Sequence, residues 1–285
     1  MPSQGSGFIT ILIGLYSYQD CLHFMASVRR FHQEPIVIVI DQVPWFLKLI
    51  LQSFKNVSFV QAPRNKNPVL ASRLAKVNLY NLSPFEKTIY LDSDICLLSP
   101  IPELFSALDA HDLLMTHDMK PKLREATNLL RGKQLDGDYG VIAALNQADI
   151  PCTDATDHYN SGLAGFRKSD VMQTLFSKYQ DYLYKVLDNQ DVFRLRDQGA
   201  LAAAIEFSKP HLKQLPASYN FMSQWKNTYG ELDSPVKVLH CTYPIRPQYA
   251  KDVTRSLMTR IFDRLARFFL PTQLNNDWRE SKGEF

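Results

Sequence analysis

Several features that would assign a chain to a class at once are missing from this sequence. Its four cysteines form no CxxC or CxxH pair, so neither a zinc knot nor a disulfide framework is indicated. No apolar run approaches the roughly 20 residues that a membrane-spanning helix requires. The leader Met1–Gly7 is polar and lacks the basic residues of a signal peptide. We therefore expect a cytoplasmic protein that is soluble or peripheral to the inner face of the membrane.

Charge of one sign is scarce as well. The 32 basic and 29 acidic residues leave a formal net charge of +3, which is too small to indicate a partner nucleic acid. The 11 glycines and 16 prolines are too few for a low-complexity chain, and 45% hydrophobic residues is ordinary globular usage. The 285 residues suffice for one large domain or two small ones.

What the sequence does contain is an alternation of short apolar runs with segments of helical periodicity. Strands are expected at Phe8–Leu15, Pro35–Asp41, Val57–Pro63, Lys87–Ile95 and Asp112–Asp118, and helices at Tyr18–Phe31, Trp45–Phe54, Val69–Leu79 and Ile101–Leu108. Strands that are apolar on both faces and alternate with helices are typical of an α/β fold with a mainly parallel central sheet flanked by helices. Ligands of such sheets bind beyond the carboxyl ends of the strands.

The second half of the sequence is less regular. Met119–Tyr159 has few periodic apolar runs and indicates long loops or short helices over the site. Further on, a strand is expected at Ser161–Phe166, helices at Val171–Leu187 and Gln198–Phe207, the second capped by Asp197, and a strand at Val236–Leu239.

The motif Asp92-Ser93-Asp94 closes one of the predicted strands. Side chains two residues apart on a strand share a face, so the two carboxylates can hold one hard cation; the alternative is a pair of solvated loop acids. His240 follows another predicted strand and could complete the site, although a lone histidine is more often structural. Arg246 comes six residues later, and a carboxylate-bound cation with an arginine nearby is a diphosphate-binding arrangement.

Five motifs in order resemble the glycogenin-like retaining glycosyltransferases (glycosyltransferase family 8), which have the GT-A fold. They are Lys76 sixteen residues before Asp92, the DxD followed by LLSPIPELF, the Asn-x-Gly of Asn160–Gly162, the Asp-Gln-Gly of Asp197–Gly199, and His240 with a basic residue six positions on. The resemblance runs from about Phe8 to Tyr249. It implies one GT-A catalytic domain over residues 1–250, with a donor half at about 8–118 and an acceptor half at about 119–250.

The resemblance also implies roles for individual residues. Asp92, Asp94 and His240 would hold Mn²⁺ (or Mg²⁺), which binds the diphosphate of a nucleotide sugar. The implied donor is a UDP-hexose, especially UDP-glucose or UDP-galactose. The implied nucleotide-sugar contacts are Gly14, Leu15, Tyr16 and Tyr18 for the base and ribose, with Tyr16 or Tyr18 available to stack on the base. Lys76, Ser93, Gly162 and Arg246 would lie nearer the diphosphate and sugar. The implied catalytic residues are Asp118, Asn160, Asp197 and Gln198, the last at the β face of the anomeric carbon. Arg246 replaces a usual lysine, and Gln248 replaces an aromatic residue.

The function that follows is a metal-dependent transfer of a hexose from a UDP-hexose to a glycan, lipid-linked or other hydroxyl acceptor, with retention. Two alternatives stay open. One is a nucleotide-sugar-binding protein that has lost turnover, and the other is an inverting transferase, for which Asp197 is the only attractive catalytic carboxylate. Taken singly, Asn160 and Gly162 could merely form a turn, Asp197 a helix cap and Lys76 a solvated lysine.

Residues 251–285 are expected to form a basic amphipathic helix and a tail. Val253–Leu270 places an apolar stripe on one side at helical period and carries four arginines against one aspartate. This stripe either packs against the domain's own core or contacts an anionic membrane surface, which would bring the site to a membrane-bound acceptor.

Overall fold

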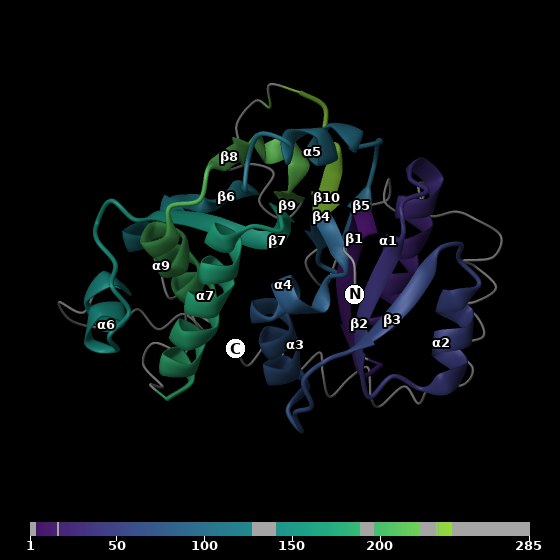
Figure 1. The fold of residues 1–285 in the computed structure, drawn as a ribbon, viewed down its shortest axis with the longest axis horizontal. Coiled ribbons are helices and arrows are strands. Elements are labelled where there is room, and N and C mark those ends of the chain that lie inside the picture. Colours follow the sequence, from purple (N-terminus) through teal and green to yellow (C-terminus); the bar gives the residue numbers. More distant parts are fainter. Residues whose placement is uncertain are drawn as a thin grey trace.

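The computed structural model describes residues 4–15, 17–126, 141–188, 197–222, 232 and 234–240. Over these ranges the chain forms an α/β fold with a seven-stranded central sheet, in the order β3-β2-β1-β4-β7-β6-β8, and a three-stranded sheet, in the order β5-β10-β9 (Figure 1). The expectations for Tyr16, Arg246, Gln248 and the segment 251–285 lie outside the described residues.

The central sheet consists of β1 (Gln4–Ile13), β2 (Ile36–Asp41), β3 (Val57–Gln61), β4 (Phe85–Leu91), β6 (Leu113–Lys122), β7 (Asp157–Arg167) and β8 (Leu212–Leu215). The smaller sheet consists of β5 (Ile95–Leu97), β9 (Phe221–Met222) and β10 (Val238–His240). The helices are α1 (Tyr18–Phe31), α2 (Trp45–Gln52), α3 (Pro68–Val77), α4 (Leu79–Leu82), α5 (Pro102–Ala107), α6 (Val141–Gln147), α7 (Asp170–Asp188) and α9 (Gln198–Ser208), with 3₁₀ turns η1 (Leu123–Glu125) and η2 (Ala217–Tyr219).

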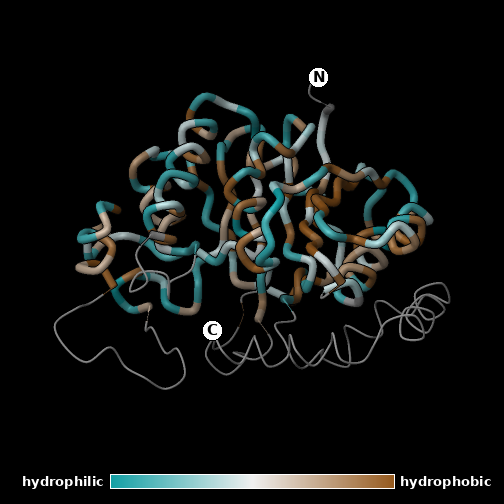
Figure 2. The backbone as a smooth tube through the Cα atoms, turned by 90° about the horizontal axis from the view of Figure 1, so that it is seen from below, coloured by the Kyte–Doolittle hydropathy of each residue, from teal (hydrophilic) through white to brown (hydrophobic). Residues whose placement is uncertain are grey.

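Helices cover both faces of the central sheet, because its strands are apolar on both sides. Ile9, Ile11 and Ile13 of β1 belong to a core shared with α3, α7 and α9, whereas Phe8 and Leu12 belong to a core shared with α1, α2 and α5. Figure 2 shows the hydrophobic segments gathered in the interior and hydrophilic ones at the perimeter. The expected α/β fold with a mainly parallel sheet flanked by helices is confirmed.

Strand direction brings several chain segments to one edge of the sheet. β1 pairs in parallel with β2 and β4, and β2 with β3, so the carboxyl ends of these strands lie together. β7 runs antiparallel to both β4 and β6, and its pairing with β6 is interrupted by a bulge between Met115 and Thr116. The bulge places Asn160–Gly162 beside the end of β4, where the backbone N–H of Asp92 donates to the carbonyl of Gly162 at 2.8 Å.

The strand expected at Lys87–Ile95 is wrong in its second part. β4 ends at Leu91, and Asp92–Asp94 form a turn in which the N–H of Ile95 donates to the carbonyl of Asp92 at 3.1 Å. The chain then enters β5 in the other sheet. The two carboxylates are therefore brought together by a turn between two sheets and not by the alternation of a strand.

The less regular segment is only partly as expected. β6 continues to Lys122 and β7 begins at Asp157, so both strands are longer than their apolar runs, because their ends carry polar side chains at the site. The short helix α6 fits the expectation for Met119–Tyr159, of which residues 127–140 are not described. Within the described ranges, every helix is too short or too polar to cross a membrane.

Candidate functional site

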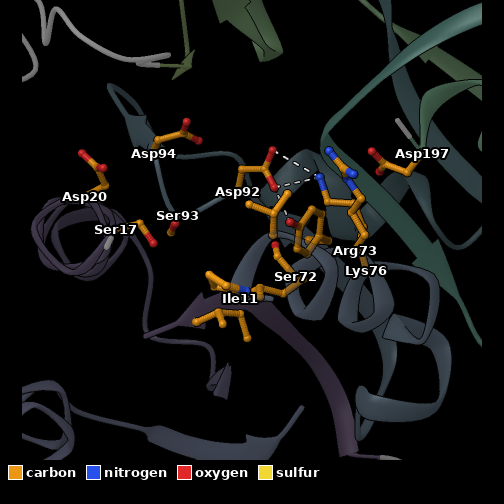
Figure 3. Close-up of a pocket in the computed structure, with 14 residues that line it drawn as sticks. Ile11, Ser17, Asp20, Ser72, Arg73, Lys76, Asp92, Ser93, Asp94 and Asp197 are labelled. Carbon is orange, nitrogen blue, oxygen red and sulfur yellow. Dashed lines mark hydrogen bonds and ion pairs between the residues drawn. The ribbon is translucent and has the colours of Figure 1, made fainter. Parts of the chain in front are cut away.

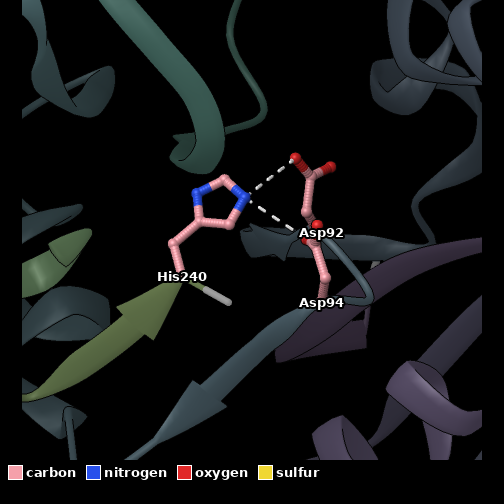
Figure 4. A group of neighbouring side chains, drawn as sticks. All are labelled: Asp92, Asp94 and His240. Atoms are coloured by element: carbon pink, nitrogen blue, oxygen red, sulfur yellow. Dashed lines mark ion pairs between the residues drawn. The ribbon is translucent and has the colours of Figure 1, made fainter. Parts of the chain in front are cut away.

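Asp92, Asp94 and His240 meet at the boundary between the two sheets. β10 pairs with β5 so that His240 lies opposite Ile95, the residue after Asp94. His240 Nε2 lies 3.3 Å from Asp94 Oδ1 and 4.0 Å from Asp92 Oδ2 (Figure 4). One ligand atom from each residue falls within 4.8 Å of the others. Two carboxylates and an imidazole are a donor set that suits a divalent ion such as Mn²⁺, so the residues present fit a metal.

The His240 ring is held on two sides. A Cβ on Gly162 would lie 2.4 Å from His240 Cε1, so only glycine leaves room for the ring. The ring nitrogen Nδ1 of His240 lies 2.9 Å from the side-chain oxygen Oδ1 of Asn220. Burial alone would lower the pKa of His240, but the charge and hydrogen bond of Asp94 outweigh it and hold the pKa above its usual value. The absence of a side chain at Gly162 thus allows the His240 ring to lie beside Asp92 and Asp94.

Lys76 lies next to this cluster, on the face of α3 that looks toward the end of β4. Its Nζ lies 3.0 Å from Asp92 Oδ1 and donates to Ser161 Oγ at 3.2 Å. Tyr90 donates its hydroxyl to the same carboxylate of Asp92. Burial would lower the pKa of Lys76, but the charges of Asp92 and Asp197 raise it above its usual value, so the ammonium group remains charged.

Asp197 lies at the start of α9, as expected, but its side chain makes no capping hydrogen bond to the helix. Instead its carboxylate accepts a hydrogen bond from the Tyr179 hydroxyl at 2.8 Å. Burial would raise the pKa of Asp197, but the positive charges of Lys76 and Arg73 hold it below its usual value. The interpretation of Asp197 as a simple helix cap is therefore wrong.

Asp118, Asn160 and Gln198 form a third group, beside the bulge of β7. Asn160 Nδ2 donates to Asp118 Oδ2 at 3.0 Å, and Gln198 Nε2 lies 3.5 Å from the same oxygen. Asn160 Oδ1 accepts from the N–H of Gly162 and from Asn220, both at 2.9 Å. The Asn160 amide is therefore bonded within the protein at both ends, which makes it a group that positions Asp118.

A hollow of about 230 Å³ opens between α1, α3 and the turn at Asp92 (Figure 3). Of the residues expected at the site, it is lined by Lys76, Asp92, Ser93, Asp94 and Asp197. Residues that the sequence did not single out line it too: Ser17, Asp20, Ser72, Arg73 and Tyr90 among them. Arg73 could have been found, because it precedes Lys76 by three residues and so shares its helix face.

The described residues expected to bind the base, Gly14, Leu15 and Tyr18, differ in how far they are exposed. Gly14 has a φ of 63°, in the left-handed region that favours glycine, and turns the chain sharply after β1. Gly14 and Leu15 are half-buried. Tyr18 is only 2% exposed and packs into the core between α1 and the sheet, so its ring is not available for stacking on a base. The expectation that Tyr18 could stack on the base is therefore wrong, because its side chain faces the core.

Comparisons with known proteins extend the likeness to whole structures. No family model matches the chain, and no curated relative matches it in sequence. The crystal structure of the galactosyltransferase LgtC in complex with donor and acceptor sugar analogs matches with a TM-score of 0.59 and 15% identity, over 96% of this chain and 99% of that one. Mouse xyloside xylosyltransferase 1 in its apo form gives a TM-score of 0.55 and 14% identity, over 85% of this chain and 100% of that one.

A third match is the bifunctional glycosyltransferase WbbM in its apo form, with a TM-score of 0.64 and 14% identity. It covers 91% of this chain but only 51% of WbbM. At these identities the likeness concerns the fold, and that fold is the GT-A fold of glycosyltransferases, as the ordered motifs imply.

Proposed function

We propose that this chain is a metal-dependent glycosyltransferase that moves a hexose from a UDP-sugar, UDP-glucose or UDP-galactose, to a hydroxyl acceptor. The observation that carries the proposal is the Asp92, Asp94 and His240 cluster, whose two carboxylates line a pocket together with Lys76. Two carboxylates and a fixed ammonium group in one hollow, with an imidazole against the carboxylates, are a donor set suited to a cation-bound diphosphate. The GT-A fold supplies the context for this chemistry but does not by itself assign it.

The residues divide the work of breaking a sugar–phosphate bond. Asp92, Asp94 and His240 would hold Mn²⁺ or Mg²⁺, which supplies a Lewis acid for the diphosphate oxygens. Lys76 adds a permanent positive charge beside them, where the leaving nucleoside diphosphate becomes more negative. Asp118 and Gln198 lie together, with Gln198 Nε2 3.5 Å from Asp118 Oδ2, and we propose that their charge and dipole stabilise positive charge on the sugar ring.

The state of Asp197 favours retention over inversion. An inverting transferase needs a general base whose pKa lies near the working pH. Asp197 is buried, accepts a hydrogen bond from Tyr179 and has a pKa held below its usual value by Lys76 and Arg73. It is therefore a weak base, suited to electrostatic stabilisation. We propose front-face substitution with retention, in which the leaving phosphate oxygen takes the acceptor proton and no side chain serves as the base.

The direct test is to incubate the protein with a panel of UDP-sugars and Mn²⁺ and to measure release of UDP. We expect release from UDP-glucose or UDP-galactose, its loss in EDTA and its recovery on adding Mn²⁺. Asp109→Asn is a suitable control, since it removes an exposed carboxylate that pairs with Lys87 and lies outside the cluster. Nucleotide-sugar binding without release, across a broad acceptor screen, would favour the binding-protein alternative instead. NMR of the product anomer decides between retention and inversion.

For the acceptor, we propose that Val253–Leu270 holds the protein at an anionic membrane surface, near a membrane-bound hydroxyl acceptor. The support is the basic amphipathic pattern of that sequence. Deletion of residues 253–285 should abolish cosedimentation with anionic vesicles and leave the melting temperature unchanged. A large fall in melting temperature, with no vesicle binding by the full chain, would assign the segment to the core.

A further inference from the structure

Two buried amides connect Asp118 to the candidate metal ligand His240. Asn160 Nδ2 donates to Asp118 Oδ2 at 3.0 Å, and Asn220 Nδ2 donates to Asn160 Oδ1 at 2.9 Å. Asn220 Oδ1 then lies 2.9 Å from His240 Nδ1. Asn160, Asn220 and His240 are 7%, 3% and 6% exposed, so water does not compete freely for these contacts. The connection joins β6, β7, the end of η2 and β10.

The directions of the hydrogen bonds that connect Asp118 to His240 follow from the carboxylate of Asp118, because it can only accept. A carboxylate accepts, so Asn160 must present its NH₂ group to Asp118. The backbone N–H of Gly162 donates to Asn160 Oδ1 at 2.9 Å and independently requires the same orientation. Asn220 must then present its NH₂ group to Asn160, and its second N–H reaches Thr116 Oγ1 at 3.1 Å. Only the carbonyl oxygen of Asn220 is left for His240.

That carbonyl oxygen decides which ring nitrogen of His240 carries the proton. An oxygen acceptor at Nδ1 requires a proton on Nδ1, and a neutral imidazole then has its lone pair on Nε2. Nε2 is the nitrogen that faces Asp94 and Asp92. We infer that Asn220 is a positioning residue of the metal site, whose amide fixes the His240 tautomer that leaves Nε2 free to bind the cation. The inference rests on the proposed function, because it concerns the same metal.

At position 220 an amide can both accept from His240 and donate to Asn160 and Thr116. Alanine offers no acceptor to His240, and the ring is confined on its other side by Gly162, so rotation of the ring is not an easy remedy. Aspartate keeps the acceptor for His240 but cannot donate to Asn160 or Thr116. The two substitutions therefore separate the effect on the histidine from the effect on the rest of the connection.

The first experiment is a calorimetric titration with Mn²⁺ alone. Asn220→Ala should weaken Mn²⁺ binding by about 10- to 100-fold, the usual cost of losing a hydrogen-bond partner of a ligating histidine. Asn220→Asp should restore the affinity to within about threefold, while still lowering the melting temperature. Ser218→Ala is the control: it removes a buried hydroxyl two residues away, bonded to Ser234 at 2.9 Å, and has no contact with His240. Its Mn²⁺ affinity should equal that of the wild type.

The second experiment reads the tautomer directly and needs no metal. In protein labelled with ¹⁵N-histidine, at an alkaline pH where the ring is neutral, the Asn220 carbonyl favours a proton on Nδ1 of His240 and the Asp94 carboxylate favours one on Nε2, so the wild type should populate the Nδ1-protonated form more than Asn220→Ala does. Asn220→Ala should shift the population toward the Nε2-protonated form, and Asn220→Asp should not. An unchanged tautomer together with unchanged Mn²⁺ affinity in Asn220→Ala would overturn the inference. A wild type that binds no Mn²⁺ would overturn the proposed metal, while the tautomer shift would still decide the role of Asn220.

Discussion

The two acidic centres of the site are built in different ways. Asp92 and Asp94 come from one turn, and their side chains are 26% and 21% exposed. Asp197 is 8% exposed and is compensated by the cations of α3 and the hydroxyl of Tyr179. The first centre leaves carboxylate oxygens at the rim of a pocket, whereas the second is satisfied within the protein. Partly exposed carboxylates at a pocket suit a cation ligand, whereas a buried carboxylate bonded within the protein supports the structure around it.

Lys76 links the two centres. Its Nζ pairs with Asp92, and the charge of Asp197 also raises its pKa. Because one ammonium group serves both acids, substitutions at each acid should have different consequences for activity and for stability.

Replacing Asp94 should have the largest effect on activity. Asp94→Asn removes a charged cation ligand, and we expect UDP release to fall by about 100-fold or more. The melting temperature in EDTA should hardly change, because the side chain is partly exposed and contributes little packing. A variant that keeps Mn²⁺-stimulated release would place the metal elsewhere. Asp109→Asn, which removes an exposed carboxylate paired with Lys87, should retain full activity.

Replacing Asp197 should lower the stability of the protein, whereas replacing Asp94 mainly lowers its activity. Asp197→Asn removes a buried negative charge that interacts with Lys76 and Arg73, and we expect a loss of about 3 kcal/mol in the free energy of unfolding. Tyr179→Phe removes only the neutral donor and should cost about 1 kcal/mol. Urea unfolding measures both. An Asp197→Asn protein as stable as the wild type would contradict the compensated state of this acid.

Two glycines of β7 offer a matched test of the metal cluster. Gly162→Ala would press a methyl group against the His240 ring, so we expect about tenfold weaker Mn²⁺ binding. Gly165→Ala would meet Leu114 and Ile89 in the core and should lower stability without changing Mn²⁺ affinity. Equal Mn²⁺ affinities for the two variants would show that Gly162 has no special role beside the histidine.

The smallest effect is a dependence on pH. A carboxylate whose pKa is lowered by folding contributes stability above its unfolded-state pKa, and loses it as the pH falls through the lower folded-state value. The pKa of Asp197 is lowered in this way. The difference in unfolding free energy between wild type and Asp197→Asn should therefore be complete at neutral pH and shrink below about pH 4. A difference that stays constant into acid would mean that the charge of Asp197 is not what is lost.

The sequence predicts best those elements whose signal is local. The expected bounds of α1 are confirmed at both ends, and β2, a continuous apolar run, is buried along its whole length. These two elements depend on periodicity within one stretch of chain. The convergence of Asp92, Asp94 and His240, which are far apart in the sequence, was expected from the family resemblance that the ordered motifs carry.

What could not be predicted depends on contacts between distant segments. The direction of β7 and its bulge are set by pairing with β4 and β6, and no local pattern encodes them. Asn220 carries no motif, and its place between Asn160 and His240 follows only from the packing of η2 against β10. Tyr18 was expected to be able to stack on the base of the nucleotide, but its side chain packs into the core against distant segments.

The central claim is that a cation held by Asp92, Asp94 and His240 binds the diphosphate of the donor. Calorimetric titration of the protein with UDP, with GDP and with no nucleotide, in Mn²⁺ and in EDTA, tests it most directly. We predict that UDP binds in Mn²⁺, that binding is lost in EDTA and in Asp94→Asn, and that GDP binds more weakly. UDP binding of equal strength in EDTA, or in Asp94→Asn, would contradict the claim.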